Sequence, residues 1–299
     1  TRTSWSIPRW RRPARARGRL VLSWKKRGWY RLIDLHTHTT ESDGTCTPWQ
    51  LVEAAGSAGL EALAISDHDT FAGFELAAPL ARKNGLELIC GIEISTRHPA
   101  RGFARRRSVH LLAYFFDGGA PAEFRAWLAG LQASRRDRNR RLAKRLGELG
   151  VHVPLSEVEA LGRNLAGRPH FARVMVARGY VRTVQEAFDR YLDESAPGYV
   201  FREEPSTAEA IGQVRDRGGV PVIAHPLRLA GGDPAREEEM IAEFREAGAE
   251  GLEVYYSDHS PSDVDRFEAI ARRYGLAPSG GSDFHGGVKP DIQLGRGRG

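Results

Sequence analysis

Six histidines and three acidic residues stand where they could share metal ions. His36 and His38 are two residues apart, as are Asp283 and His285, and side chains at this spacing in a strand point the same way. The full set is His36, His38, Asp43, His68, Glu93, His110, His225, Asp283 and His285. Imidazoles mixed with carboxylates suit Mn²⁺, Zn²⁺ or Fe²⁺ better than Ca²⁺. Nine donors exceed what one ion needs, so we expect two or three ions bridged by Glu93.

A multi-metal cluster without a serine or cysteine nucleophile motif predicts hydrolysis by a metal-bound hydroxide. One ion lowers the pKa of its water, while the others bind phosphoryl oxygens and neutralise the leaving group. We expect Asp43, His68 and Glu93 to lie nearest the chemistry. The acids expected to orient ligand imidazoles from behind are Glu41, Asp67 and Asp69.

Seven short apolar runs predict the strands that carry these donors. They are Leu32–His36, Leu60–Ser66, Leu86–Ser95, Val109–Phe116, Val220–His225, Gly251–Tyr256 and Leu276–Ser282. Several are rich in Ile, Val and Leu, as parallel strands covered on both faces should be. The predicted helices between them are Pro48–Gly59, Phe71–Asn84, Thr207–Arg217, Pro234–Ala247 and Ser262–Tyr274. This alternation predicts a parallel α/β barrel whose site lies at the carboxyl ends of the strands.

The segment 121–201 contains helical patterns only. These patterns are Pro121–Leu149, Ser156–Leu161, His170–Ala177 and Thr183–Leu192. We therefore predict a barrel formed by residues 32–120 and 202–299, with a helical insertion at 121–201. The longest insertion helix carries an arginine run that includes Arg135 and Arg138, whose guanidinium groups could grip phosphate in bidentate fashion. The alternative interpretation of this run is a solvated helix face.

The charge of the chain is divided unevenly. The 299 residues carry 44 basic and 38 acidic side chains, a net charge of +6. Eleven basic residues and no acidic one fall in residues 1–31, so the other 268 residues carry 33 basic against 38 acidic, a net charge of −5. We interpret 1–31 as a disordered, non-catalytic tail, either transit-like or a misplaced start. The acidic remainder argues against binding of a DNA duplex, which needs a stripe of cations.

The motifs that hold the donors resemble those of the PHP family, named for polymerase and histidinol phosphatase. They are Asp34-Leu35-His36-Thr37-His38, Ser66-Asp67-His68, Gly91-Ile92-Glu93, Ala224-His225-Pro226 and Gly281-Ser282-Asp283-Phe284-His285. The resemblance spans Leu32 to about Leu294. It implies a distorted (β/α)7 barrel with a helical insertion that caps the site, a trinuclear site usually loaded with Mn²⁺, and the nine residues as ligands. The loop between Glu93 and His110 is longer and more basic than is usual.

Ser42-Asp43-Gly44-Thr45 and Gly167-Arg168-Pro169-His170-Phe171-Ala172 are similar to one branch of that family. The resemblance implies a 3′,5′-bisphosphonucleotide phosphatase or a 5′→3′ exoribonuclease acting on a 5′-phosphorylated RNA end. The residues expected to bind the second phosphate or the 5′ end are Arg135, Arg136, Arg138, Arg168 and His170. Tyr255 and Phe284 are candidate stacking surfaces for a base. The alternatives are a histidinol-phosphate-like monoesterase and a non-catalytic metal-binding PHP module.

The remaining features favour a soluble intracellular protein. Cys46 and Cys90 lack CxxC spacing, which excludes a disulfide scaffold and indicates a reducing compartment. No apolar run approaches the length of a membrane span. We expect a cytoplasmic monomer.

Overall fold

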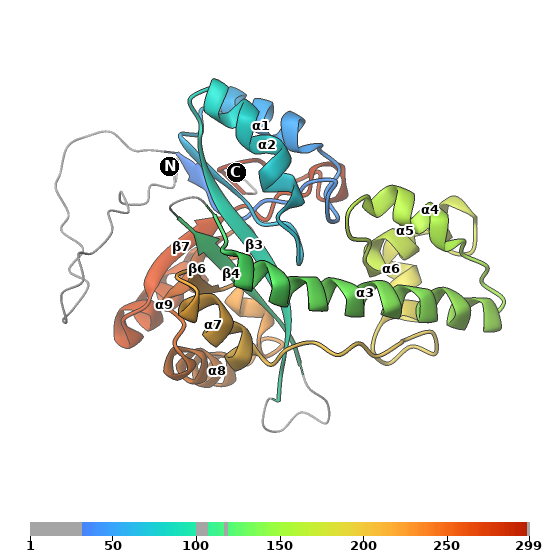
Figure 1. Cartoon of the computed structure of the whole chain (residues 1–299). Coiled ribbons are helices and arrows are strands. Elements are labelled where there is room, and N and C mark those ends of the chain that lie inside the picture. The colour runs from blue at the N-terminus through green and yellow to red at the C-terminus, as the bar shows by residue number, and fades with distance from the viewer. Residues whose placement is uncertain (1–31, 100–106, 117–118, 298–299) are drawn as a thin grey trace.

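The computed structural model describes residues 32–99, 107–116 and 119–297, and these residues form a barrel with a helical lobe beside it (Figure 1). The basic segment 1–31 and most of the arginine-rich loop after residue 99 lie outside the described residues. Within the described part, no helix is long and apolar enough to cross a membrane.

Seven strands form one sheet in the order β1 to β7. They are β1 (Ile33–Asp34), β2 (Ala62–Ile65), β3 (Glu87–His98), β4 (Arg107–Phe115), β5 (Val220–Ile223), β6 (Gly251–Tyr256) and β7 (Ala277–Gly281). Beyond β1, the Leu35 amide donates to the Gly280 carbonyl at 3.2 Å, and the Asp283 amide donates to the His36 carbonyl at 2.8 Å. These bonds join the first strand to the last, so the sheet is a nearly closed barrel.

The prediction of an all-parallel barrel is wrong at β4. This strand runs antiparallel to both β3 and β5, while the other neighbouring pairs are parallel. β3 ends at His98 and β4 begins at Arg107, and the two strands pair as a long antiparallel hairpin instead of a parallel crossover unit. The reversal places the amino end of β4 beside the carboxyl ends of its neighbours, and His110 lies near that end.

Five helices cover the barrel: α1 (Pro48–Ser57), α2 (Ala72–Lys83), α7 (Thr207–Asp216), α8 (Pro234–Ala247) and α9 (Pro261–Tyr274). Their boundaries lie within two residues of the predicted ones. Thr47 caps α1 through a reciprocal pair of hydrogen bonds with Gln50, as the Thr-Pro start predicts. Short 3₁₀ turns, η2 (Pro226–Arg228) and η3 (Gly286–Val288), follow β5 and β7.

The segment between β4 and β5 is helical, as predicted. It contains α3 (Ala122–Glu148), α4 (Leu155–Gly162), α5 (Arg168–Ala177), α6 (Val184–Ala187) and the π-helical turn η1 (Phe188–Leu192). Helix α3 extends from the barrel to the lobe formed by the others (Figure 1). Leu146, Val158, Phe171 and Met175 belong to a buried cluster separate from the barrel core. The lobe therefore has its own apolar core.

Candidate metal centre

The structure brings all nine predicted donors to one end of the barrel, called here the mouth. His36 and His38 follow β1, His68 follows β2, and His225 follows β5. Asp283 and His285 follow β7, whereas Glu93 lies within β3 and His110 within β4. Asp43 enters from the loop before α1. Donors that span 250 residues of sequence meet because the strand ends meet.

Glu93 lies at the centre of the mouth. Its Oε1 is 2.9 Å from His110 Nδ1 and 2.9 Å from His225 Nε2. Its Oε2 is 3.3 Å from His36 Nε2, 3.1 Å from His38 Nε2 and 3.3 Å from His68 Nδ1. A carboxylate with imidazoles beside both oxygens has the geometry of a bridging ligand.

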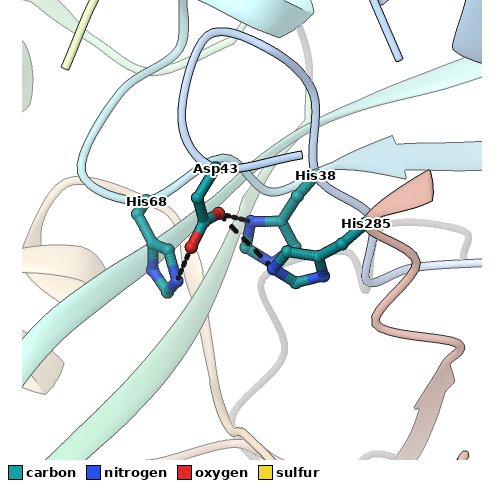
Figure 2. Close-up of side chains that lie close together, drawn as sticks. All are labelled: His38, Asp43, His68 and His285. Carbon is teal, nitrogen blue, oxygen red and sulfur yellow. Dashed lines mark ion pairs between the residues drawn. The ribbon is translucent and has the colours of Figure 1, made fainter. Parts of the chain in front are cut away.

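Two further carboxylates complete the donor groups. Asp43 lies between three imidazoles, with Oδ1 3.5 Å from His38 Nδ1 and 3.4 Å from His285 Nε2, and Oδ2 3.6 Å from His68 Nε2 (Figure 2). Asp283 Oδ1 is 3.5 Å from both His36 Nε2 and His38 Nε2. Three overlapping groups of donor atoms result: one around Asp43, one around Asp283 and one around Glu93.

The donor atoms fit divalent cations. His36 Nε2, His38 Nε2 and His68 Nδ1 are buried and have no hydrogen-bond partner, and a buried polar atom without a partner calls for an explanation such as an ion. Burial by itself would raise the pKa of Glu93, but His68, His36 and His110 hold that pKa well below its usual value. Neutral imidazoles and ionised carboxylates are the forms that bind Mn²⁺ or Zn²⁺.

Glu253 supports the centre and was not predicted from the sequence. This fully buried residue of β6 has Oε1 2.8 Å from His36 Nδ1, and its Oε2 accepts from the His225 amide at 2.6 Å. Since His36 Nδ1 donates to Glu253, the lone pair of His36 Nε2 faces the mouth. Glu253 is the only acid in the apolar run Gly251–Tyr256, and that pattern is the signal that could have identified it.

The three acids expected behind the imidazoles have other partners. Asp67 accepts from the Thr39 amide at 2.7 Å and from Ser42 Oγ at 2.6 Å, so it orders the loop that carries Asp43. Burial raises the pKa of Asp67 to about 6. Glu41 lies 3.9 Å from Arg163, and Asp69 binds arginines.

A pocket with about 640 Å³ of empty space, partly open to solvent, adjoins the mouth. Asp43, His68 and His110 line it. The same pocket is lined by a basic group, called here the basic wall, that consists of Arg135, Arg138, Arg168, His170 and Arg202. Candidate metal donors and cationic side chains thus line a common space.

Arg136 does not belong to this wall. It is exposed, whereas Arg135 and Arg138 are buried, because positions three apart on α3 share a face and the next residue is turned by about 100°. Arg202 belongs to the basic wall instead. It lies in the extended segment that returns to the barrel, so no helical spacing in the sequence indicates its role. Phe284 packs in the core beside α1 and α2, and Tyr255 binds Glu268, so neither lines the pocket.

Two groups of the basic wall have unused donors. Arg138 Nε donates to Asn139 Oδ1 at 3.0 Å, but among the described residues its guanidinium forms no ion pair. Burial and the neighbouring Arg135 and Arg202 lower the pKa of Arg138. His170 Nδ1 accepts from the Gly167 amide at 2.9 Å, which leaves the proton on Nε2, a buried atom without a hydrogen-bond partner. Both groups could therefore donate to an anion.

A family model for the PHP domain matches residues 34–149. The 3′,5′-nucleoside bisphosphate phosphatase of Chromobacterium violaceum is 34% identical over 257 residues, which cover 85% of this chain and 87% of that protein. A 5′-3′ exoribonuclease of Haemophilus influenzae is 34% identical, with 84% and 89% covered. A phosphoribosyl 1,2-cyclic phosphate 1,2-diphosphodiesterase of Eggerthella lenta is also 34% identical, with 85% and 94% covered.

Solved structures share the fold across nearly the same range. An amidohydrolase from Chromobacterium violaceum, solved with bound sulfate, has a TM-score of 0.76 at 32% identity and covers 88% of this chain and 90% of its own. A metal-dependent phosphoesterase from Bifidobacterium adolescentis has a TM-score of 0.74 at 36% identity, with 86% and 89% covered. With nine candidate metal donors at the mouth of this barrel, the chain belongs to the PHP family and is a metal-dependent phosphoesterase.

Proposed function

We propose that the enzyme hydrolyses the 3′-phosphoester of 5′-phosphorylated nucleotides. One observation carries the proposal: the basic wall and three of the candidate metal donors, Asp43, His68 and His110, line a single pocket. A substrate with two phosphates could place one at the donors and the other against the arginines. A 3′,5′-bisphosphonucleotide and the 5′-phosphorylated end of an RNA both have that form, and relatives at 34% identity are named for each activity.

The nine donors at the mouth would hold two or three ions, for which we propose Mn²⁺. When bound, such ions activate water and neutralise charge on the phosphoryl oxygens and the leaving group. Asp43, His68 and Glu93 line or border the pocket and would lie nearest the scissile phosphate. A non-catalytic module is disfavoured because all nine donor positions hold metal-binding side chains.

The basic wall would bind the second phosphate. Arg138 and His170 contribute N–H groups that pair with no acid among the described residues. Arg168 lies beside aromatic rings, with its guanidinium 6.0 Å from the ring centre of Phe188. Charge-assisted hydrogen bonds of this kind are about twice as strong as neutral ones. Phe188 also lines the pocket and is our candidate surface for a nucleobase.

The test is a comparison of kcat/KM among substrates with purified, Mn²⁺-loaded enzyme. A 3′,5′-bisphosphonucleotide should react at least about tenfold better than the matching 3′-monophosphate, because one charged hydrogen bond contributes about 1.5–3 kcal/mol. Histidinol phosphate, which lacks a second phosphate, should be a poor substrate. Equal rates for the two nucleotides, or a preference for histidinol phosphate, would refute the proposal.

A second candidate is hydrolysis of a cyclic phosphodiester. It rests on the relative named for a phosphoribosyl 1,2-cyclic phosphate, which is as similar to this chain as the phosphatase is. The same pocket could hold that substrate, because it too pairs a reacting phosphate with a separate one. Adding the cyclic phosphate to the panel separates the candidates, since the larger kcat/KM identifies the natural substrate class.

A further inference from the structure

Asp69 lies between the mouth and the basic wall and belongs to neither. It follows His68 directly, and its amide donates to the Glu93 carbonyl at 3.0 Å. Its carboxylate accepts from the Ser95 amide at 2.9 Å and forms ion pairs with Arg135 and Arg202, the latter at 3.4 Å. One fully buried side chain therefore joins the barrel to two arginines of the pocket.

The backbone of Asp69 is held in an uncommon conformation. Its φ of +53° lies in the left-handed region, which non-glycine residues adopt rarely and usually at sites where the surroundings fix them. Gln132 of α3 donates to the Asp69 carbonyl at 3.0 Å. The barrel loop and the insertion helix thus fix Asp69 from both sides.

We propose that Asp69 is a positioning residue that sets the Arg135–Arg202 pair for recognition of the substrate's second phosphate. This inference rests on the proposed function. Arg135 comes from the insertion and Arg202 from the segment returning to the barrel, so no shared element fixes their separation. Two guanidinium groups repel each other, and the Asp69 carboxylate between them offsets that repulsion.

The remaining contacts of the pair support this role. Arg135 also donates to Ser95 Oγ at 2.9 Å, and Ser95 lines the pocket. Arg202 forms a second ion pair with Glu204, so it keeps one anchor when Asp69 is neutralised. Loss of the Asp69 charge should therefore shift the arginines within the pocket and leave the fold intact.

The experiment compares Asp69→Asn with Asp137→Asn, a control on the exposed face of α3 where the acid pairs with Arg141. KM and kcat are measured for a 3′,5′-bisphosphonucleotide and for the matching 3′-monophosphate, together with bound Mn²⁺ per chain. We expect Asp69→Asn to raise KM for the bisphosphate by at least tenfold, with kcat, metal content and monophosphate kcat/KM unchanged. The control should match the wild type.

Equal losses on both substrates, or loss of Mn²⁺, would show that Asp69 supports the His68 loop and would overturn the inference. If Asp69→Asn does not fold, Asp69→Glu keeps the charge but displaces it, and the same substrate-selective rise in KM is expected. Failure of both variants to fold would also overturn it. A wild-type enzyme without preference for the bisphosphate would instead refute the proposed function, so the two failures are distinguishable.

Discussion

At the scale of single residues, the centre depends on how each imidazole is oriented. A histidine can bind an ion through one ring nitrogen only if its other nitrogen carries the proton. Glu253 accepts the proton of His36 Nδ1 and so leaves His36 Nε2 free to bind an ion. The Asp283 carbonyl, 2.8 Å from His285 Nδ1, does the same for His285. These acceptors determine which lone pairs face the mouth, so they govern metal affinity without binding an ion.

We predict that Glu253→Ala weakens metal binding by about 10–100-fold, because outer contacts of this kind typically contribute that much. His36 would lose the acceptor of its Nδ1 proton, and the His225 amide would lose its partner. The measurement is Mn²⁺ titration of chelator-treated protein by calorimetry, with exposed Glu246→Ala as the control. Unchanged Mn²⁺ affinity in Glu253→Ala would contradict the assigned role.

Arg138 allows a prediction that separates binding from stability. A buried guanidinium without an ion pair is costly, so Arg138→Met should leave the free energy of unfolding unchanged or higher. The KM of the Arg138→Met variant for a bisphosphonucleotide should rise by about tenfold or more. Urea unfolding and steady-state kinetics measure the two effects. Exposed Arg136→Met is the matched control and should change neither quantity; a stability loss in Arg138→Met with normal KM would make the residue structural.

At the scale of elements, the predictions succeeded where a local pattern decides the structure. Strand and helix boundaries follow apolar runs, caps and glycines, so they agree with the structure to within a few residues. The direction of β4 could not be predicted in this way, because an apolar run does not show whether its strand is parallel or antiparallel to its neighbours. The hairpin lies in the segment between Glu93 and His110, for which the resemblance indicates only a loop longer and more basic than is usual.

Six of the nine predicted metal donors follow a strand, and Glu93 and His110 lie within one, so the strand pattern made them recognisable; Asp43 lies in the loop before α1. The arginines that line the pocket were harder to predict, because a dense run of arginines does not show which face of the helix meets the barrel. Arg135 and Arg138 face the pocket while Arg136 does not, and that choice depends on how α3 packs. Arg202 could be assigned to the pocket only from the fold, which brings distant segments together, whereas Glu253 could have been recognised as the single acid in an apolar run.

Barrel closure depends on a glycine at the end of β7. A Cβ on Gly281 would lie 2.3 Å from His36 Cβ and 2.5 Å from the His36 amide nitrogen, so β1 would have to move. We predict that Gly281→Ala lowers the free energy of unfolding by about 1–3 kcal/mol, the usual cost of overpacking, and weakens Mn²⁺ binding through His36.

Urea unfolding and Mn²⁺ titration test this prediction. Gly130→Ala is the control, because a Cβ at that position on α3 meets nothing within 4 Å. It should stabilise the protein by about 0.5–1 kcal/mol through helix propensity. If Gly281→Ala behaved like Gly130→Ala, the close approach of β7 to His36 would not constrain the barrel.

At the scale of the whole molecule, the candidate metal centre joins six of the seven strands that the described residues form. Ions that bind the folded chain stabilise it by about 2.7 kcal/mol at 100 times their Kd. We therefore predict that Mn²⁺ raises the Tm of chelator-treated protein by several degrees, which calorimetry measures. Glu93→Ala removes the central carboxylate and should abolish most of the shift. An equal shift in that variant would place the stabilising ions elsewhere.

The charge distribution leads to a final prediction about nucleic acids. Residues 32–299 carry a net charge of −5, and the cations of the pocket are confined to the basic wall. Each phosphate contact along a single strand would add about 0.7 to the slope of log affinity against log salt. For a chain that starts at Leu32, KM should therefore depend only weakly on salt, and to a similar degree for a 5′-phosphorylated dinucleotide and for an RNA of about twenty nucleotides.

The full chain is the comparison, since its first 31 residues add eleven basic side chains. A steep slope for the longer RNA with the shortened chain would reveal backbone contacts beyond the pocket and would mean that the enzyme grips a strand, and not only its phosphorylated end.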